Sequence, residues 1–76
     1  MAYNKSVVSR DELMKHVGKV IEFDDFQGEH HKGLLMTNMT QAGALARYMI
    51  REEEYNYIFR KSHVKGEVTV YTEVIS

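Results

Sequence analysis

The chain has 76 residues, enough for one small domain, and its 43% apolar and 28% charged residues exclude a disordered chain. The formal net charge is −1 and the pI is about 6.4, so a generally basic nucleic-acid binder is excluded and any polyanion site must be a local patch. Cysteine is absent, so no disulfide is available, and oligomerisation is a common way for so small a chain to gain buried area.

The first predicted element is a short helix that runs from about Arg10 to Val17. Ser9 stands at a candidate N-cap position and Glu12 follows three residues later, which is the spacing of a capping box. Gly18 is suited to the left-handed conformation that commonly ends a helix. The chain should therefore begin its folded core with one capped helix.

Two strands are predicted next, over residues 19–26 and 30–39, with a turn at Gln27-Gly28. Apolar and acidic residues alternate in the first of them, which is typical of a half-buried strand. Gly33 lies inside the second, and a glycine within a strand often marks a bulge or a sharp bend. We therefore expect a strongly bent hairpin.

The segment from Thr40 to Glu54 has two interpretations. A helix is favoured by its alanines and by the spacing of Leu45, Tyr48 and Met49. A strand from about Ala44 to Arg51 is favoured by period-two alternation, with Glu52-Glu53-Glu54 as a solvated turn after it. We favour the strand and keep the helix as the alternative.

Two further alternating segments, residues 55–64 and 67–74, predict strands joined by a tight turn at Lys65-Gly66. The predicted fold is thus one domain over residues 1–76, mainly β (α+β), with a short N-terminal helix and a strongly bent five-stranded antiparallel sheet or small barrel. If the middle segment is helical, the order becomes α-β-β-α-β-β.

This order of elements resembles the Sm-like family of small SH3-like barrels. The family's first motif is matched by Gly28, Gly33 and Leu35, and its second by Phe59, Arg60, Ser62, His63 and Val64. Lys61 replaces the glycine of the second motif, and Asn38-Met39 stands where the family has an aromatic residue and an aspartate. The resemblance implies a ring oligomer that binds RNA, with Arg60 and Ser62 at the binding loop.

Cations interleaved with tyrosines form the best candidate site in the sequence. Single-stranded nucleic acids and nucleotides are bound by phosphate pairing together with base stacking on aromatic rings. Tyrosine and arginine are also enriched at protein interfaces, so a protein partner fits the same residues. The candidate binding residues are Arg47, Tyr48, Arg51, Tyr57, Arg60, Lys61 and His63.

Catalysis and metal binding are not expected. His30 and His31 are adjacent and would point to opposite faces of a strand, and Asp24-Asp25 flank a turn where both should be solvated. No cofactor motif, signal peptide or membrane-spanning run is recognisable, which favours the cytoplasm. We expect a non-catalytic, oligomeric module that binds RNA, single-stranded DNA or a nucleotide. The alternative is a small phage-type or bacterial accessory protein that inhibits or adapts a larger protein.

Overall fold

A computed structural model of the chain describes residues 2–37 and 47–74. Its elements in chain order are β1 (Ala2–Val8), the 3₁₀ helix η1 (Arg10–His16), β2 (Val20–Asp25), β3 (His30–Thr37), β4 (Tyr48–Arg51), β5 (Asn56–Phe59), the 3₁₀ turn η3 (Lys61–His63) and β6 (Val64–Val74). No helix in these two ranges is long and apolar enough to cross a lipid bilayer.

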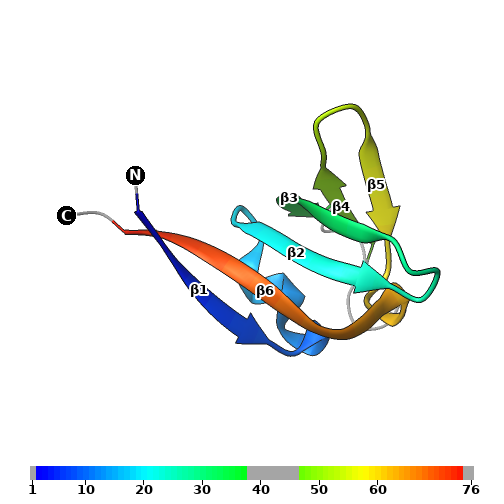
Figure 1. The fold of residues 1–76 in the computed structure, drawn as a ribbon, viewed down its shortest axis with the longest axis horizontal. Coiled ribbons are helices and arrows are strands. Elements are labelled where there is room, and N and C mark those ends of the chain that lie inside the picture. The colour runs from blue at the N-terminus through cyan, green and yellow to red at the C-terminus, as the bar shows by residue number, and fades with distance from the viewer. Residues whose placement is uncertain (1, 38–46, 75–76) are drawn as a thin grey trace.

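The strands form one antiparallel sheet in the order β1-β6-β2-β3-β4-β5 (Figure 1). The prediction of a mainly β fold is confirmed. The sheet is strongly curved but does not close, because β1 and β5 lie at its two edges and no pairing joins them within the described ranges. The prediction of five strands is wrong, since the sheet has six.

The unpredicted strand is β1, which pairs with β6 along its whole length, from Ala2 opposite Val74 to Val8 opposite Val68. The end of this pair that carries the two termini extends beyond β2, away from the rest of the molecule (Figure 1). Residues 2–7 of β1 are all exposed. Val8 at the end of β1 packs against the core, whereas residues 2–7 are exposed on both faces, so the strand shows no apolar alternation in the sequence.

The predicted helix is present as η1, in 3₁₀ rather than α geometry. The side chain of Ser9 accepts a hydrogen bond from the Asp11 N–H at 3.2 Å, as an N-cap residue does. Leu13 is fully buried and anchors η1 to the sheet. Gly18 follows with a φ of +94°, so the predicted helix end is also confirmed.

The predicted turn at Lys65-Gly66 is wrong, because both residues lie within β6. The chain reverses earlier, at η3, so the strand predicted over residues 55–64 ends at Phe59. Gly66 has a φ of +78° at a bulge in β6. There, Glu22 pairs with Thr69 and Asp24 with Lys65, and the extra residues on β6 bend the strand around the core.

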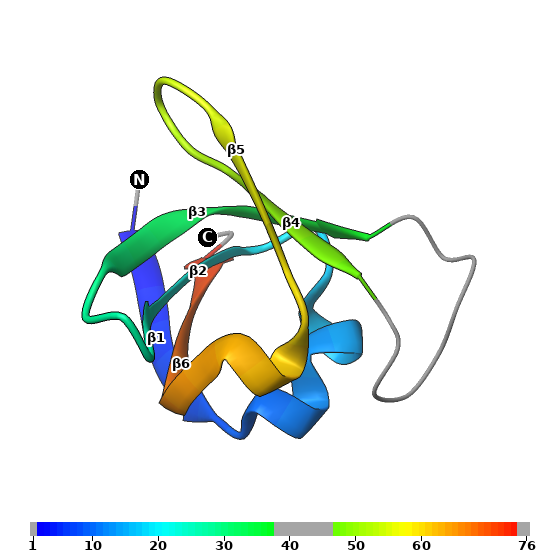
Figure 2. The same ribbon diagram turned by 90° about the vertical axis from the view of Figure 1, so that its right-hand side faces the viewer.

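The middle segment is a strand where the structure describes it, since β4 covers Tyr48–Arg51. The helical alternative is therefore wrong for these residues, and the predicted elements over residues 40–46 lie outside the described ranges. The curved sheet encloses the core, and η1 and η3 lie together against its inner side (Figure 2). The core side chains are Leu13, Ile21, Phe23, Leu35, Tyr48, Ile50, Phe59, Val64, Val68 and Val70.

Candidate functional site

The seven predicted binding residues do not form one site. Arg47 precedes β4 and Arg51 ends it, so at about 3.3 Å per residue they lie about 13 Å apart along the strand. Tyr48 is only 5% exposed and belongs to the core. Its proposed role as a stacking surface is wrong, because the alternation of β4 turns Tyr48 and Ile50 inward together.

Arg60, Lys61 and His63 do lie close together, around η3, but they serve its local structure. The Arg60 backbone N–H donates to Nδ1 of His63 at 3.0 Å. Nζ of Lys61 forms an ion pair of 3.1 Å with Asp11, which lowers the pKa of that carboxyl group and ties η3 to η1. The Lys61 ammonium group is therefore partly neutralised by a carboxylate of η1.

A different group of cations and tyrosines gathers on the outer face of the sheet. Lys5 on β1, Tyr71 on β6 and Val20 on β2 stand opposite one another in one row. The Tyr71 ring has Nζ of Lys32 4.7 Å and Nζ of Lys5 5.5 Å from its centroid. With Tyr3 these residues line a hollow of about 380 Å³, which we call the lysine–tyrosine face.

The lysine–tyrosine face continues into a second hollow of about 330 Å³, which Tyr3 and Tyr71 share with Lys19. The Tyr71 hydroxyl donates to the Glu22 carboxylate, which lowers the pKa of Glu22 and raises that of Tyr71. This bond fixes the tilt of the ring between the two lysines. Sequence reasoning missed the face because Tyr3 and Lys5 come from the unpredicted β1.

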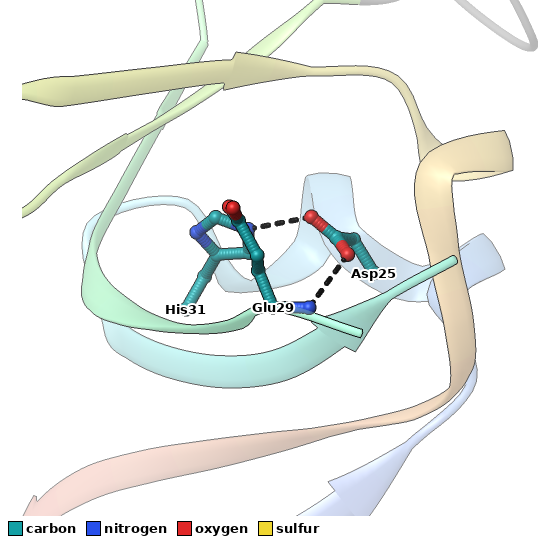
Figure 3. A group of neighbouring side chains, drawn as sticks. All are labelled: Asp25, Glu29 and His31. Atoms are coloured by element: carbon teal, nitrogen blue, oxygen red, sulfur yellow. Dashed lines mark hydrogen bonds and ion pairs between the residues drawn. The ribbon is translucent and has the colours of Figure 1, made fainter. Parts of the chain in front are cut away.

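The second notable group lies inside the sheet, around His31 on β3. Its Nε2 is 2.9 Å from Oδ2 of Asp25, and its Nδ1 is 2.8 Å from Oε1 of Glu52. The Glu29 carboxylate comes within 3.9 Å of the same Nε2 (Figure 3). We call these four residues the His31 cluster. His31 and Asp25 are 1% and 3% exposed, so the expectation that Asp25 would be solvated is wrong.

The electrostatics of the His31 cluster favour positive charge on the ring. Burial lowers the pKa of His31, but the hydrogen bonds to Asp25 and Glu52 outweigh it and the pKa is raised. The same bond to His31, helped by the Glu29 backbone N–H, lowers the pKa of Asp25. Tyr57 stacks on the His31 ring at 3.8 Å, and burial followed by the charge of Asp25 raises the pKa of its phenol.

The adjacent histidines do point to opposite faces, as predicted, and His30 lies outside between Asp24 and Glu22 at 2.7 Å from each. The prediction against metal binding took no account of the acidic residues that surround His31 on the inner side. Ligand atoms of Asp25, Glu29 and His31 all lie within 4.8 Å of one another, so these residues could hold a metal ion.

A third hollow, of about 370 Å³, opens beside the His31 cluster. Phe26 and Ile58 line it and are 66% and 64% exposed, although both are large apolar side chains. Tyr57 and His63 from the predicted set also line it. This Phe26–Ile58 pocket therefore combines apolar anchors with two polar rings.

Comparison of the chain with protein-family models, with curated proteins and with solved structures gives no match.

Proposed function

We propose that the protein is a non-catalytic, oligomeric binding module of the cytoplasm that takes single-stranded RNA or DNA, or a nucleotide, on the lysine–tyrosine face. The observation that carries the proposal is the Tyr71 ring, which lies between two lysine ammonium groups, 4.7 and 5.5 Å from its centroid, on the wall of an open hollow.

The chemistry of this face suits a chain of phosphates and flat bases. A tyrosine ring offers a stacking surface that every base can use, and the neighbouring lysines can neutralise the phosphates on either side of that base. Tyr3 is 50% exposed and lines both hollows, so it can take a second base. Because the net charge of the chain is −1, nucleic acid should bind at a local basic patch such as this face, not over the whole surface.

The proposal keeps the resemblance to Sm-like barrels as its second part. After β1, the chain runs through a helix, four strands, a 3₁₀ turn and a last strand, and that last strand, β6, pairs back with β2. These features support a small SH3-like architecture. The proposed nucleic-acid site is nevertheless on the outer face of the sheet, whereas the resemblance implies a site at the loop that carries Arg60.

Oligomerisation would use the two free sheet edges. β6 lies between β1 and β2, so β1 and β5 are the edges that can add a strand from another copy. An exposed edge strand offers unpaired N–H and C=O groups to such a neighbour. β1 is seven residues long and exposed over residues 2–7, which makes it the better candidate edge.

The test is fluorescence anisotropy with a labelled oligouridylate, titrated at several salt concentrations. Each phosphate contact in a single strand contributes a slope of about −0.7 to log K against log salt, so K5Q/K32Q should reduce the slope by about 1.4. Tyr71→Ala should lose one stacking interaction of about 1–3 kcal/mol, which is a loss of about 5- to 150-fold in affinity.

Three control variants make the result specific. Tyr71→Phe keeps the ring and should bind almost as the native protein does. Lys15→Gln removes a lysine from η1, where Nζ faces Glu12, and should leave the slope unchanged. Arg60→Ala tests the site favoured by the sequence. If Arg60→Ala removes binding while K5Q/K32Q does not, the lysine–tyrosine face is the wrong site.

The alternative, an accessory protein that binds a larger protein, is favoured by the Phe26–Ile58 pocket. Exposed aromatic and aliphatic side chains beside a hollow are typical anchors of protein interfaces. A partner recovered with the native protein and lost with F26A/I58A, but retained with Tyr71→Ala, would support this function. Failure of F26A/I58A to affect capture would contradict it.

A further inference from the structure

The His31 cluster is built with the geometry of a metal site. Around an ion with ligand bonds of about 2.0–2.1 Å, two ligand atoms at the tetrahedral angle are about 3.4 Å apart. Nε2 of His31 lies 2.9 Å from Oδ2 of Asp25 and 3.9 Å from Oε2 of Glu29. These two distances differ from about 3.4 Å by about half an ångström, and the ligand atoms of all three residues lie within 4.8 Å of one another, so closure of the exposed Glu29 side chain by about 1 Å would bring the three to ligand distances.

His31 and Asp25, the two buried members of the cluster, are each oriented by further hydrogen bonds, as metal ligands commonly are. Glu52 accepts at Nδ1 of His31, which leaves Nε2 directed at the two remaining carboxylates. Oδ1 of Asp25 accepts backbone N–H groups from Gln27 and Glu29 at 2.8 and 2.9 Å, which directs Oδ2 at His31. The ring itself is stacked on Tyr57, with 10° between the planes.

The charges of the cluster are unbalanced without a cation. The carboxylates of Asp25, Glu29 and Glu52 surround one imidazole, and no lysine or arginine in residues 2–37 and 47–74 forms a salt bridge with any of them. If Nδ1 donates to Glu52, a neutral ring would direct its Nε2 lone pair at Asp25 from 2.9 Å. Either a second proton or a metal ion must lie there.

We propose that Nε2 of His31 and the carboxylates of Asp25 and Glu29 bind a divalent ion of the Zn²⁺ class, with Glu52 as the outer partner of the histidine. One nitrogen and two oxygens suit Zn²⁺, whereas Mg²⁺ prefers oxygens and keeps its waters. The Glu29 side chain is 65% exposed, so the ion can enter past it and a water can complete the coordination.

The experiment is calorimetric titration of the full chain with ZnCl₂ at neutral pH, followed by ¹⁵N NMR of the histidine rings. The expected result is one Zn²⁺ per chain, a shift of the His31 Nε2 resonance, release of about one proton and a raised melting temperature. MgCl₂ should produce none of these changes.

Two variants test the residues without disturbing the core. Glu29→Gln changes an exposed side chain and should weaken Zn²⁺ binding by at least about tenfold, and Glu52→Gln should weaken it by about 10- to 100-fold. His30→Gln is the matched control, because His30 is the neighbouring, exposed histidine with two carboxylates of its own, Glu22 and Asp24.

The proposal is overturned if Zn²⁺ does not bind, or if the His31 ring stays doubly protonated at saturating Zn²⁺, since the cluster would then be an internal ion pair. It is also overturned if His30→Gln removes binding and Glu29→Gln does not, because the ion would then lie on the outer face. Zn²⁺ binding that survives His30→Gln and is lost with Glu29→Gln supports it.

Discussion

Gly33 on β3 lies so close to β4 that its replacement by alanine should be strongly destabilising. A Cβ at this position would lie 2.2 Å from the Arg51 carbonyl oxygen and 2.5 Å from Cγ2 of Ile50. The nearer atom belongs to the backbone of β4, so no side-chain rotation can relieve the contact. β4 would have to move by about 1 Å away from β3 to reach an ordinary contact distance.

Two effects contribute to the loss of unfolding free energy in Gly33→Ala. Overpacking a core costs about 1–3 kcal/mol, and each ladder hydrogen bond that weakens as β4 moves adds about 0.5–1.5 kcal/mol. We therefore expect Gly33→Ala to lose about 3 kcal/mol of unfolding free energy. The whole domain has about 4–11 kcal/mol at the usual value per residue, so the loss is easily measured by urea unfolding.

Gly28→Ala is the matched control, because Gly28 has a φ of +86° and an added Cβ would meet nothing within 4 Å. It should cost only the backbone strain, about 1–2 kcal/mol. Gly33→Ala should also weaken the ring-current shift of His31, since β4 and β5 carry Glu52 and Tyr57 to it. If the two variants have the same free energy of unfolding, β4 does not lie as close to Gly33 as these distances require.

Three further outcomes follow from the contacts above. Leu13→Ala should cost about 2–5 kcal/mol in urea unfolding, because Leu13 is fully buried and its loss leaves a cavity under η1. The hydrogen bond from the Tyr71 hydroxyl lowers the pKa of Glu22 below 4.5, its usual value. This bond therefore stabilises the folded state fully above pH 4.5, and the stabilisation is lost as the pH falls through the lower folded-state pKa of Glu22. The free energy of unfolding, measured between pH 3 and 7, should be less pH-dependent in Tyr71→Phe. Lys61→Gln should leave the urea midpoint almost unchanged, since its ion pair with Asp11 is largely exposed, and a large shift would mean that the pair holds η3 in place.

Local signals in the sequence were sufficient where a feature depends on neighbouring residues. The N-cap at Ser9 and the turn at Gly28 each follow from one residue and its immediate context. The glycine at position 33 marks a close approach of the neighbouring strand β4, which is one of the reasons for a glycine within a strand. The turn predicted at Lys65-Gly66 was wrong because a glycine with positive φ occurs in bulges within strands as well as in hairpin turns. β1 was missed because a strand that is exposed on both faces over residues 2–7 lacks the alternation that identifies a strand.

The His31 cluster was partly readable from the sequence. Asp25 continues the inward-facing series of Ile21 and Phe23, so period two alone places this carboxylate in the core. A buried aspartate then requires a partner, and His31 stands on the inner face of the next strand. Glu52 could not be found in this way, because its position depends on the pairing of β4 with β3, which the sequence does not specify.

The same alternation should make the two proposed sites separable. On β3, the side chain of Lys32 belongs to the lysine–tyrosine face and the side chain of His31 points into the interior, although the two residues are adjacent. Lys32→Gln should therefore weaken oligonucleotide binding without changing the Zn²⁺ titration, and Glu29→Gln should do the reverse. The double variant should add the two effects within about 0.5 kcal/mol, as independent sites do. A larger coupling, measured by anisotropy with and without Zn²⁺, would mean that the β2–β3 hairpin transmits metal binding to the outer face and that the sites are not independent.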